Sequence, residues 1–251
     1  MALLSALNLR GGYNSLEVLH GVDFEVDEGQ LVVVLGPNGA GKSTLLGCLV
    51  RAVRTFSGTI TFNGRSILSS RTSEVARTGL VLVPQEGNVF TDLSVQENLA
   101  LAVSATSRGL ERSKQVGRLS DAVYDRFPFL SLRQNQPAAL LSGGERQALA
   151  VSMGFLQNPT LMLLDEPTAG LSQLAAANLE SWILERVTEG LSIVWVVEQD
   201  PETVLKSATS AYLLDGGYVK YSGPAQALAG KGANFLFQLQ DKSTIIGRTE
   251  K

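Results

Sequence analysis

The sequence predicts an α/β fold with a mostly parallel sheet, a small antiparallel sheet beside it and an inserted helical segment. Four near-continuous apolar runs have the length of buried strands: Leu31–Leu35, Leu80–Val83, Leu161–Leu164 and Ile193–Val197. Such runs suit strands that are covered on both faces. Helical patterns lie between or beside them, at Lys42–Val53, Gly144–Leu156 and Leu174–Val187. Alternating strands and helices favour an α/β architecture.

Two regions depart from this alternation. Shorter strands joined by turns are expected at Leu3–Leu9, Val22–Val26 and Thr59–Phe62, which predicts the antiparallel sheet. Residues 86–156 lack buried strands and contain helical stretches at Val95–Val103 and Arg112–Tyr124, with Pro128 and Pro137 as breakers. We therefore expect one domain over residues 1–251. Residues 1–85 and 157–230 form its core with the β subdomain, 86–156 a helical subdomain, and 231–251 a tail.

Composition limits the kind of protein. A chain of 251 residues that is 44% hydrophobic can bury one large core. The net charge of −3 gives no broad basic field for nucleic acid. Cys48, the only cysteine, predicts a reducing compartment and a buried thiol. The start lacks a signal-peptide pattern and no apolar run could span a bilayer, so we expect a soluble protein that reaches membranes through a partner.

A glycine loop follows the first apolar strand and opens a helix. It reads Gly36-Pro37-Asn38-Gly39-Ala40-Gly41-Lys42-Ser43 and fills every fixed position of G-x-x-x-x-G-K-[ST]. Its backbone N–H groups and the helix N-terminus favour a bound phosphate. Lys42 can reach the β- and γ-phosphates, Ser43 can offer a hydroxyl to Mg²⁺, and Thr44 can add a phosphate contact. A turn that only closes a βα unit is the weaker interpretation.

A pair of acidic residues ends a second apolar strand. Asp165 follows Leu161–Leu164, where its carboxylate can orient Mg²⁺ through water, and Glu166 comes next, able to accept a proton from attacking water. Phosphoryl transfer depends mainly on positioning and charge stabilisation. Without other motifs, this pair would indicate an ordinary strand end before a turn. Because the chain also contains the glycine loop, the pair favours a catalytic role.

The run Leu141-Ser142-Gly143-Gly144-Glu145-Arg146-Gln147 is the most selective motif. Ser142 can cap a helix, and Gly143 and Gly144 can present backbone donors to a γ-phosphate. Ser142 and Glu145 also match a capping box, and both interpretations can hold together.

These motifs, in this order, resemble those of ATP-binding cassette ATPases over nearly the whole chain. The resemblance implies a P-loop NTPase (RecA-like) core that binds ATP and Mg²⁺. It places Tyr13 against adenine, Gln85 near Mg²⁺ and the transport subunit, and Ala169–Ser172 at a dimer interface. It also implies that Ser142, Gly143 and Gly144 close over a nucleotide held by a second ATPase subunit. Tyr13 and Gln85 alone would be read as a surface aromatic and a turn residue.

The chain departs from this family at three positions. Gln199 stands where most members carry a histidine near the γ-phosphate; it can donate a hydrogen bond but cannot become cationic. We therefore expect slower hydrolysis that depends mostly on Glu166. The sole histidine, His20, precedes the glycine loop and is expected to be structural. Ser172 replaces a common aspartate and Met153 a common arginine, which implies weaker coupling or a dissimilar partner.

The strand end Glu198-Gln199, with Val83–Phe90 and Leu93–Leu99, resembles one of the two ATPases of branched-chain amino acid importers, whose relatives import urea or amides. This implies a heterodimer of ATPases, two transmembrane permease subunits, an indirect substrate-binding protein, and a place at the cytoplasmic face of the membrane. Two alternatives stay open: an exporter ATPase and a soluble nucleotide-binding module without a transporter.

Overall fold

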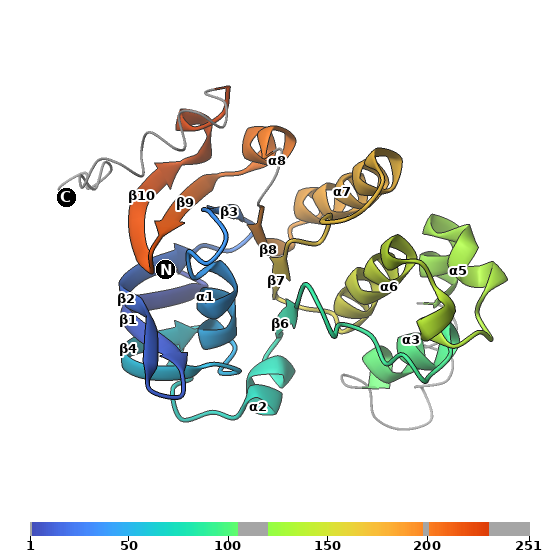
Figure 1. Cartoon of the computed structure of the whole chain (residues 1–251), viewed down its shortest axis with the longest axis horizontal. Coiled ribbons are helices and arrows are strands. Elements are labelled where there is room, and N and C mark those ends of the chain that lie inside the picture. The colour runs from blue at the N-terminus through green and yellow to red at the C-terminus, as the bar shows by residue number, and fades with distance from the viewer. Residues whose placement is uncertain (1, 105–119, 198–200, 231–251) are drawn as a thin grey trace.

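The computed structural model describes residues 2–104, 120–197 and 201–230. Its larger sheet has the strand order β10-β9-β3-β8-β7-β6 (Figure 1). These strands are β3 Leu31–Leu35, β6 Leu80–Val83, β7 Leu161–Asp165, β8 Ser192–Val196, β9 Ser210–Asp215 and β10 Tyr218–Pro224. All neighbours pair in parallel except β9 and β10, which are antiparallel. The sheet therefore brings the ends of β3, β6, β7 and β8 to one edge.

The smaller sheet is antiparallel, in the order β2-β1-β4-β5. Its strands are β1 Leu4–Tyr13, β2 Leu16–Val26, β4 Arg54–Phe62 and β5 Arg65–Ser66. Helix α1, Lys42–Leu49, contacts β1, β2 and β4 on one side and β7 on the other. The α1 helix thus lies between the two sheets, as Figure 1 shows.

Two apolar cores cover the two faces of the larger sheet. Along β3, Leu31, Val33 and Leu35 pack into one core with the helical part of the chain. Val32 and Val34 pack into the other, with α1 and the smaller sheet. This burial on both faces explains the unbroken apolar runs in the central strands.

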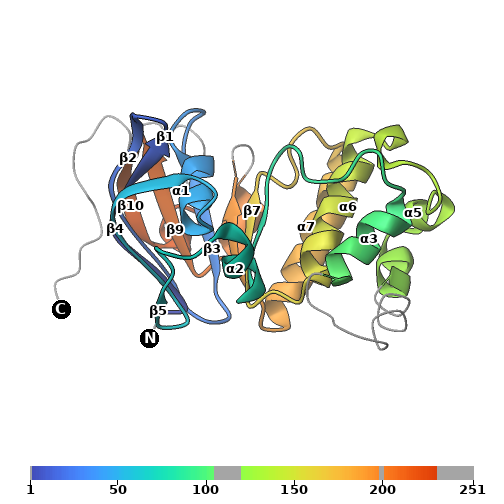
Figure 2. The same cartoon turned by 90° about the horizontal axis from the view of Figure 1, so that it is seen from below.

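One group of helices lies at the end of the molecule far from the smaller sheet (Figure 2). They are α3 Val95–Ser104, α5 Pro128–Leu132 and α6 Gly143–Leu156, with the short turn η1 Ala138–Leu140 and helical residues at 120–126. Helix α7, Gln173–Thr188, lies between this group and the sheet (Figure 1). Helices α2 Thr72–Arg77 and α8 Glu202–Ser207 and the turn η2 Ala225–Ala227 complete the fold. In the described ranges, no helix combines the length and apolarity needed to cross a bilayer.

The α/β prediction with a separate antiparallel sheet and helical insertion is confirmed, with corrections to individual elements. The predicted helix Lys42–Val53 ends at Leu49, because Arg51 adopts a left-handed φ of 64° and β4 begins at Arg54. The apolar run Leu45–Val50 is buried on all sides, so its pattern does not mark the helix end. β1 and β2 extend to a tight turn after Tyr13 and are longer than expected. Most of the predicted helix Arg112–Tyr124 lies outside the described residues.

Candidate nucleotide-binding and hydrolysis site

The glycine loop joins the end of β3 to the start of α1. Lys42 is only 5% exposed, and its Nζ donates to the carbonyl oxygens of Gly36 at 2.8 Å and Pro37 at 3.1 Å. Gly41 has a φ of 100°, a conformation that residues with a side chain rarely adopt. The loop therefore curls around the lysine ammonium, as a phosphate cradle requires.

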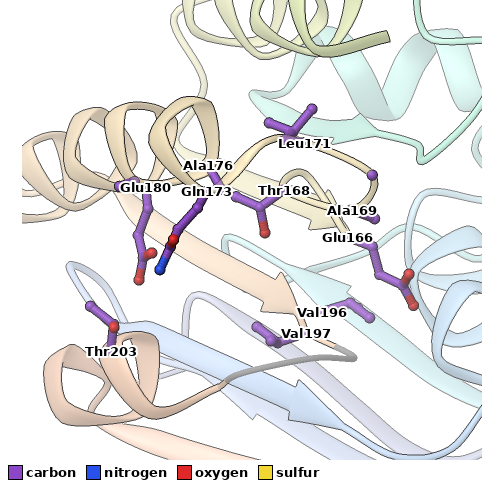
Figure 3. Close-up of a pocket in the computed structure, with 12 residues that line it drawn as sticks. Glu166, Thr168, Ala169, Leu171, Gln173, Ala176, Glu180, Val196, Val197 and Thr203 are labelled. Atoms are coloured by element: carbon purple, nitrogen blue, oxygen red, sulfur yellow. The ribbon is translucent and has the colours of Figure 1, made fainter.

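Glu166 follows β7 and turns its carboxylate toward this lysine. Its Oε1 lies 3.6 Å from Lys42 Nζ, and its Oε2 accepts a hydrogen bond from Gln85 Nε2 at 3.1 Å. Glu166 is 8% exposed and has a left-handed φ of 48°, so the backbone is strained at this residue. Figure 3 shows its carboxylate directed away from α7. Three separate segments, α1, the end of β7 and the loop after β6, thus converge on one carboxylate.

Asp165 has the environment of a metal-binding carboxylate. Burial raises its pKa, while a hydrogen bond with Ser43 and the charge of Lys42 act in the opposite direction. Its Oδ1 is buried and has no hydrogen-bond partner among the described residues. A divalent cation would satisfy that oxygen. Ser43 and the Oε1 of Gln85, whose Nε2 is engaged by Glu166, supply further oxygen ligands, so the residues present fit Mg²⁺.

The run from Leu141 to Gln147, here called the signature run, includes the beginning of α6. Ser142 Oγ accepts from the Glu145 backbone N at 3.3 Å, and Glu145 Oε2 accepts from the Ser142 backbone N at 2.8 Å. This is the predicted capping box. Ser142 and Gly143 are exposed, and no atom lies within 4 Å of a Cβ placed on Gly143. The first amides of α6 therefore face open space.

Two open cavities adjoin Glu166. One, of about 550 Å³, is lined by Glu166, the loop at 168–171, α7 and Thr203 (Figure 3). The other, of about 460 Å³, is lined by Glu166, Gly143 and the loop at 85–88. Ser172 caps α7 after this loop, because its Oγ accepts from the Ala175 backbone N at 3.4 Å. Residues 169–170 line both cavities and so lie beside the carboxylate.

Comparison with known proteins decides the family. The ABC transporter family model matches residues 19–169. The chain is 34% identical to a probable branched-chain amino acid transport ATP-binding protein of Archaeoglobus fulgidus, LivF, over 90% of this chain and 94% of that protein. The chain belongs to the ABC transporter family. This membership makes it an ATPase.

Other relatives of this ABC ATPase span nearly the same length. A high-affinity branched-chain amino acid transport ATP-binding protein of Pseudomonas aeruginosa, BraG, is 35% identical over 86% of this chain and 90% of its own. A lipopolysaccharide export system ATP-binding protein of Haemophilus influenzae, LptB, is 31% identical over 91% and 93%. A solved ATP-binding subunit of an ABC transporter superposes with a TM-score of 0.82 at 28% identity, covering 96% of this chain and all of that one. The P-loop NTPase fold is thereby confirmed.

The structure places other predicted residues of this ABC ATPase as follows. Tyr13 ends β1 with 51% of its surface exposed, so its ring is available to a ligand. His20 lies on β2, with Nδ1 2.9 Å from Glu17 Oε1 and its ring centroid 4.9 Å from that of Tyr218. Met153 lies on α6 and packs in the core. Gln199 lies outside the described residues.

Sequence reasoning missed contacts that link the motifs of this ABC ATPase. It did not foresee that Gln85 and Lys42 both engage Glu166, nor that Asn88 hydrogen-bonds Gln147 at 2.7 Å. It also missed Gly217, whose backbone N donates to the Ala40 carbonyl oxygen at 3.0 Å. The paired glycines 216–217 signal a turn, but no sequence pattern says that this turn touches the phosphate loop.

Proposed function

We propose that this chain is an ATP-binding and ATP-hydrolysing subunit of an importer for branched-chain or related amino acids. The observation that carries the hydrolytic part is the position of Glu166, buried next to Asp165 and held by both Lys42 and Gln85. Among the described residues, Glu166 is the one whose carboxylate forms an ion pair with the phosphate-loop lysine. The import part rests on the two amino acid transport relatives.

Each residue has a defined task in this proposal. Residues 36–44 hold the phosphates, and phosphate oxygens compete with Gly36, Pro37 and Glu166 for the Lys42 ammonium. That exchange frees Glu166 to accept a proton from the attacking water. Ser43, Gln85 and Asp165 would hold Mg²⁺, which would supply charge neutralisation at the phosphates when bound. Tyr13 stacks on adenine, which contributes about 1–3 kcal/mol by analogy with base stacking on aromatic side chains.

The proposal includes partners. The signature residues Ser142, Gly143 and Gly144 serve a nucleotide on a second ATPase subunit, and the open space before α6 supports this role. Preferential ATP binding to the closed pair drives closure. Gln199 cannot supply a positive charge, so a partner ATPase with histidine at this position would make the two composite sites unequal, as expected for a heterodimer. Two permease subunits then hold the pair at the cytoplasmic face of the membrane, with a substrate-binding protein acting on the opposite side.

Other cargo and the opposite direction of transport remain as alternatives. The lipopolysaccharide export relative of Haemophilus influenzae aligns over a similar length, so the exporter alternative keeps a specific basis. Urea or amide import would use the same ATPase machinery. Copurification of the complex, followed by identification of its permeases and transport assays with leucine, urea and acetamide, separates these cargoes.

Replacement of Glu166 by Gln tests the ATPase role. We expect turnover to fall at least about 100-fold, because a general base contributes 10²–10⁴-fold. ATP binding persists and an ATP-bound dimer accumulates, which size-exclusion chromatography with nucleotide analysis measures. Glu189→Gln, an exposed carboxylate at the far end of α7, is the matched control and keeps wild-type turnover. Unchanged turnover in Glu166→Gln would contradict the proposal.

A further inference from the structure

A partly buried side-chain contact joins α6, the helix that begins with the signature run, to the loop that follows β6. Gln147 lies on α6 and is 7% exposed. Its Oε1 accepts a hydrogen bond from Asn88 Nδ2 at 2.7 Å. The same Nδ2 lies 3.2 Å from the Pro84 carbonyl oxygen and 3.4 Å from that of Gln85. One amide group of Asn88 therefore holds both α6 and the backbone that carries Gln85.

Gln85 extends this contact to the hydrolytic carboxylate. Its side chain donates to Glu166 Oε2, and Glu166 Oε1 faces Lys42. A series of polar contacts thus runs from α6 through Asn88 and Gln85 to the phosphate-loop lysine. Contiguous polar contacts of this kind can carry energetic coupling between two sites when the elements they join can move relative to one another.

Gln147 also holds an unused donor. Within the described residues its Nε2 is buried and has no hydrogen-bond partner. A buried donor left without a partner destabilises the arrangement that leaves it so. The cavity of about 460 Å³ that adjoins Gln147 is lined by Gly143, Glu166 and the loop at 85–88, so α6 and the loop meet across open space. Gln147 therefore keeps a donor free for a new partner when α6 and this loop shift relative to one another.

We propose that Asn88 and Gln147 are positioning residues. Through them, the position of α6 determines the position of the Glu166 carboxylate. The inference rests on the proposed function, because it requires two composite ATP sites. The start of α6 serves the partner's nucleotide, and Glu166 serves the nucleotide of its own chain. When the partner's nucleotide draws α6 into place, the Asn88–Gln147 bond moves the loop that holds Gln85, and Gln85 repositions Glu166. Each site thereby responds to the occupancy of the other.

A double-mutant cycle tests this inference. Asn88→Ala removes the donor, and Gln147→Met removes the acceptor while keeping the length of a buried side chain. Gln157→Met is the matched control, because Gln157 follows the same helix and its Nε2 donates only to the Met153 carbonyl oxygen, at 3.3 Å. ATP turnover against ATP concentration is measured on the transporter purified with its permeases and partner ATPase. Binding of a fluorescent ATP analogue and thermal unfolding are measured on the full chain.

We expect each single variant to lower kcat about 5- to 20-fold and to bring the Hill coefficient close to one, in the usual range of coupling between sites. The dissociation constant of the analogue changes less than about twofold, because neither residue contacts the phosphate loop. The double variant loses no more turnover than the more affected single variant. Gln157→Met behaves like the wild type.

Three outcomes would overturn the inference. The first is wild-type kcat and Hill coefficient in both single variants. The second is a double variant whose loss equals the product of the two single losses. The third is a loss of kcat that is matched by equal losses of Tm or nucleotide affinity, which indicates a purely structural role. If Glu166→Gln turns over as fast as the wild type in the same complex, the proposed function fails instead.

Discussion

The helices α1 and α6 both begin at glycine-containing loops suited to phosphate, yet their first turns are built differently. Helix α1 begins after Gly41 with no side-chain cap, and its first residue, Lys42, is buried. Helix α6 begins after Ser142 with a complete capping box, and Ser142 and Gly143 are exposed. The first helix start is enclosed by its own chain, whereas the second faces outward.

In the proposed function, the difference follows from the position of each nucleotide, which is bound by the same chain at α1 and by the partner chain at α6. At α1 the backbone amides are left for phosphate, and Lys42 is held near them by Gly36, Pro37 and Glu166. At α6 the capping box uses the amides of Ser142 and Glu145, so the helix start is stable alone while the amides between them remain for a ligand. The start of α1 is held by contacts within its own chain and needs no such cap, whereas an exposed helix start offered to another chain must keep its shape before the partner arrives.

Gly143→Asp should abolish the function of the outward-facing start of α6 (the outward-facing half) and leave the enclosed start of α1 (the enclosed half) intact. The new side chain meets no atom within 4 Å, so the fold is retained, but its carboxylate occupies the place of a phosphate. We expect the full chain to bind a fluorescent ATP analogue with wild-type affinity. Turnover of the assembled complex falls more than about 100-fold, as is typical when charge stabilisation is lost in a transition state. Weakened binding to the isolated chain would show that this glycine serves its own nucleotide.

Gly217→Ala should weaken nucleotide binding at the start of α1, although Gly217 lies outside the glycine loop at 36–43. Gly217 donates to Ala40, and its own carbonyl oxygen accepts from the His20 backbone N at 3.0 Å. A Cβ at this position would lie 1.8 Å from the Val18 carbonyl oxygen, so the turn that contacts Ala40 must shift. We expect nucleotide affinity to fall about 10-fold, equivalent to about 1.4 kcal/mol, measured by titration of the fluorescent analogue.

Gly216→Ala is the matched control for that variant. Gly216 lies in the same turn with a left-handed φ of 53°, but no atom lies within 4 Å of its Cβ position. The left-handed conformation costs each variant about 1–2 kcal/mol of stability, and Gly217→Ala loses more because its Cβ also clashes with Val18. Only Gly217→Ala weakens nucleotide binding. Equal affinities in the two variants would mean that the turn does not support the loop.

The phosphate loop before α1 and the strand before Asp165 were easier to predict from sequence than the contacts that link them to α6. The loop at 36–43 and the strand before Asp165 have fixed local patterns, and the structure places them where those patterns require. β9 and β10 were not predicted as elements, because β10 is a partly exposed edge strand without clean alternation. The end of α1 was misplaced because burial on every side removes the periodicity that marks a helix.

Long-range contacts lay beyond sequence reasoning for a physical reason. Asn88 and Gln147 are 59 positions apart, and Gln85 and Glu166 are 81 apart. Each residue alone is compatible with an ordinary loop or helix. Only the register of β6 beside β7, together with the packing of α6 on β6, brings these side chains within hydrogen-bond distance. Local patterns therefore located the motifs, and tertiary packing determined which of them are in contact.

Asp165→Asn should give the smallest change, a gain in the stability of the fold. It tests whether a carboxylate kept for function near the start of α1 destabilises the folded chain. Burial raises the pKa of Asp165, and its Oδ1 has no hydrogen-bond partner in the described structure, so the charged form destabilises the fold. We expect the variant to be more stable at pH 7 by about 1 kcal/mol, or about 2–4 °C in Tm. This advantage shrinks as the pH falls toward about 4, because the folded carboxyl takes up its proton before the unfolded one. Added Mg²⁺-ATP stabilises the wild type more than the variant, and lower stability of the variant at pH 7 without nucleotide would contradict this account.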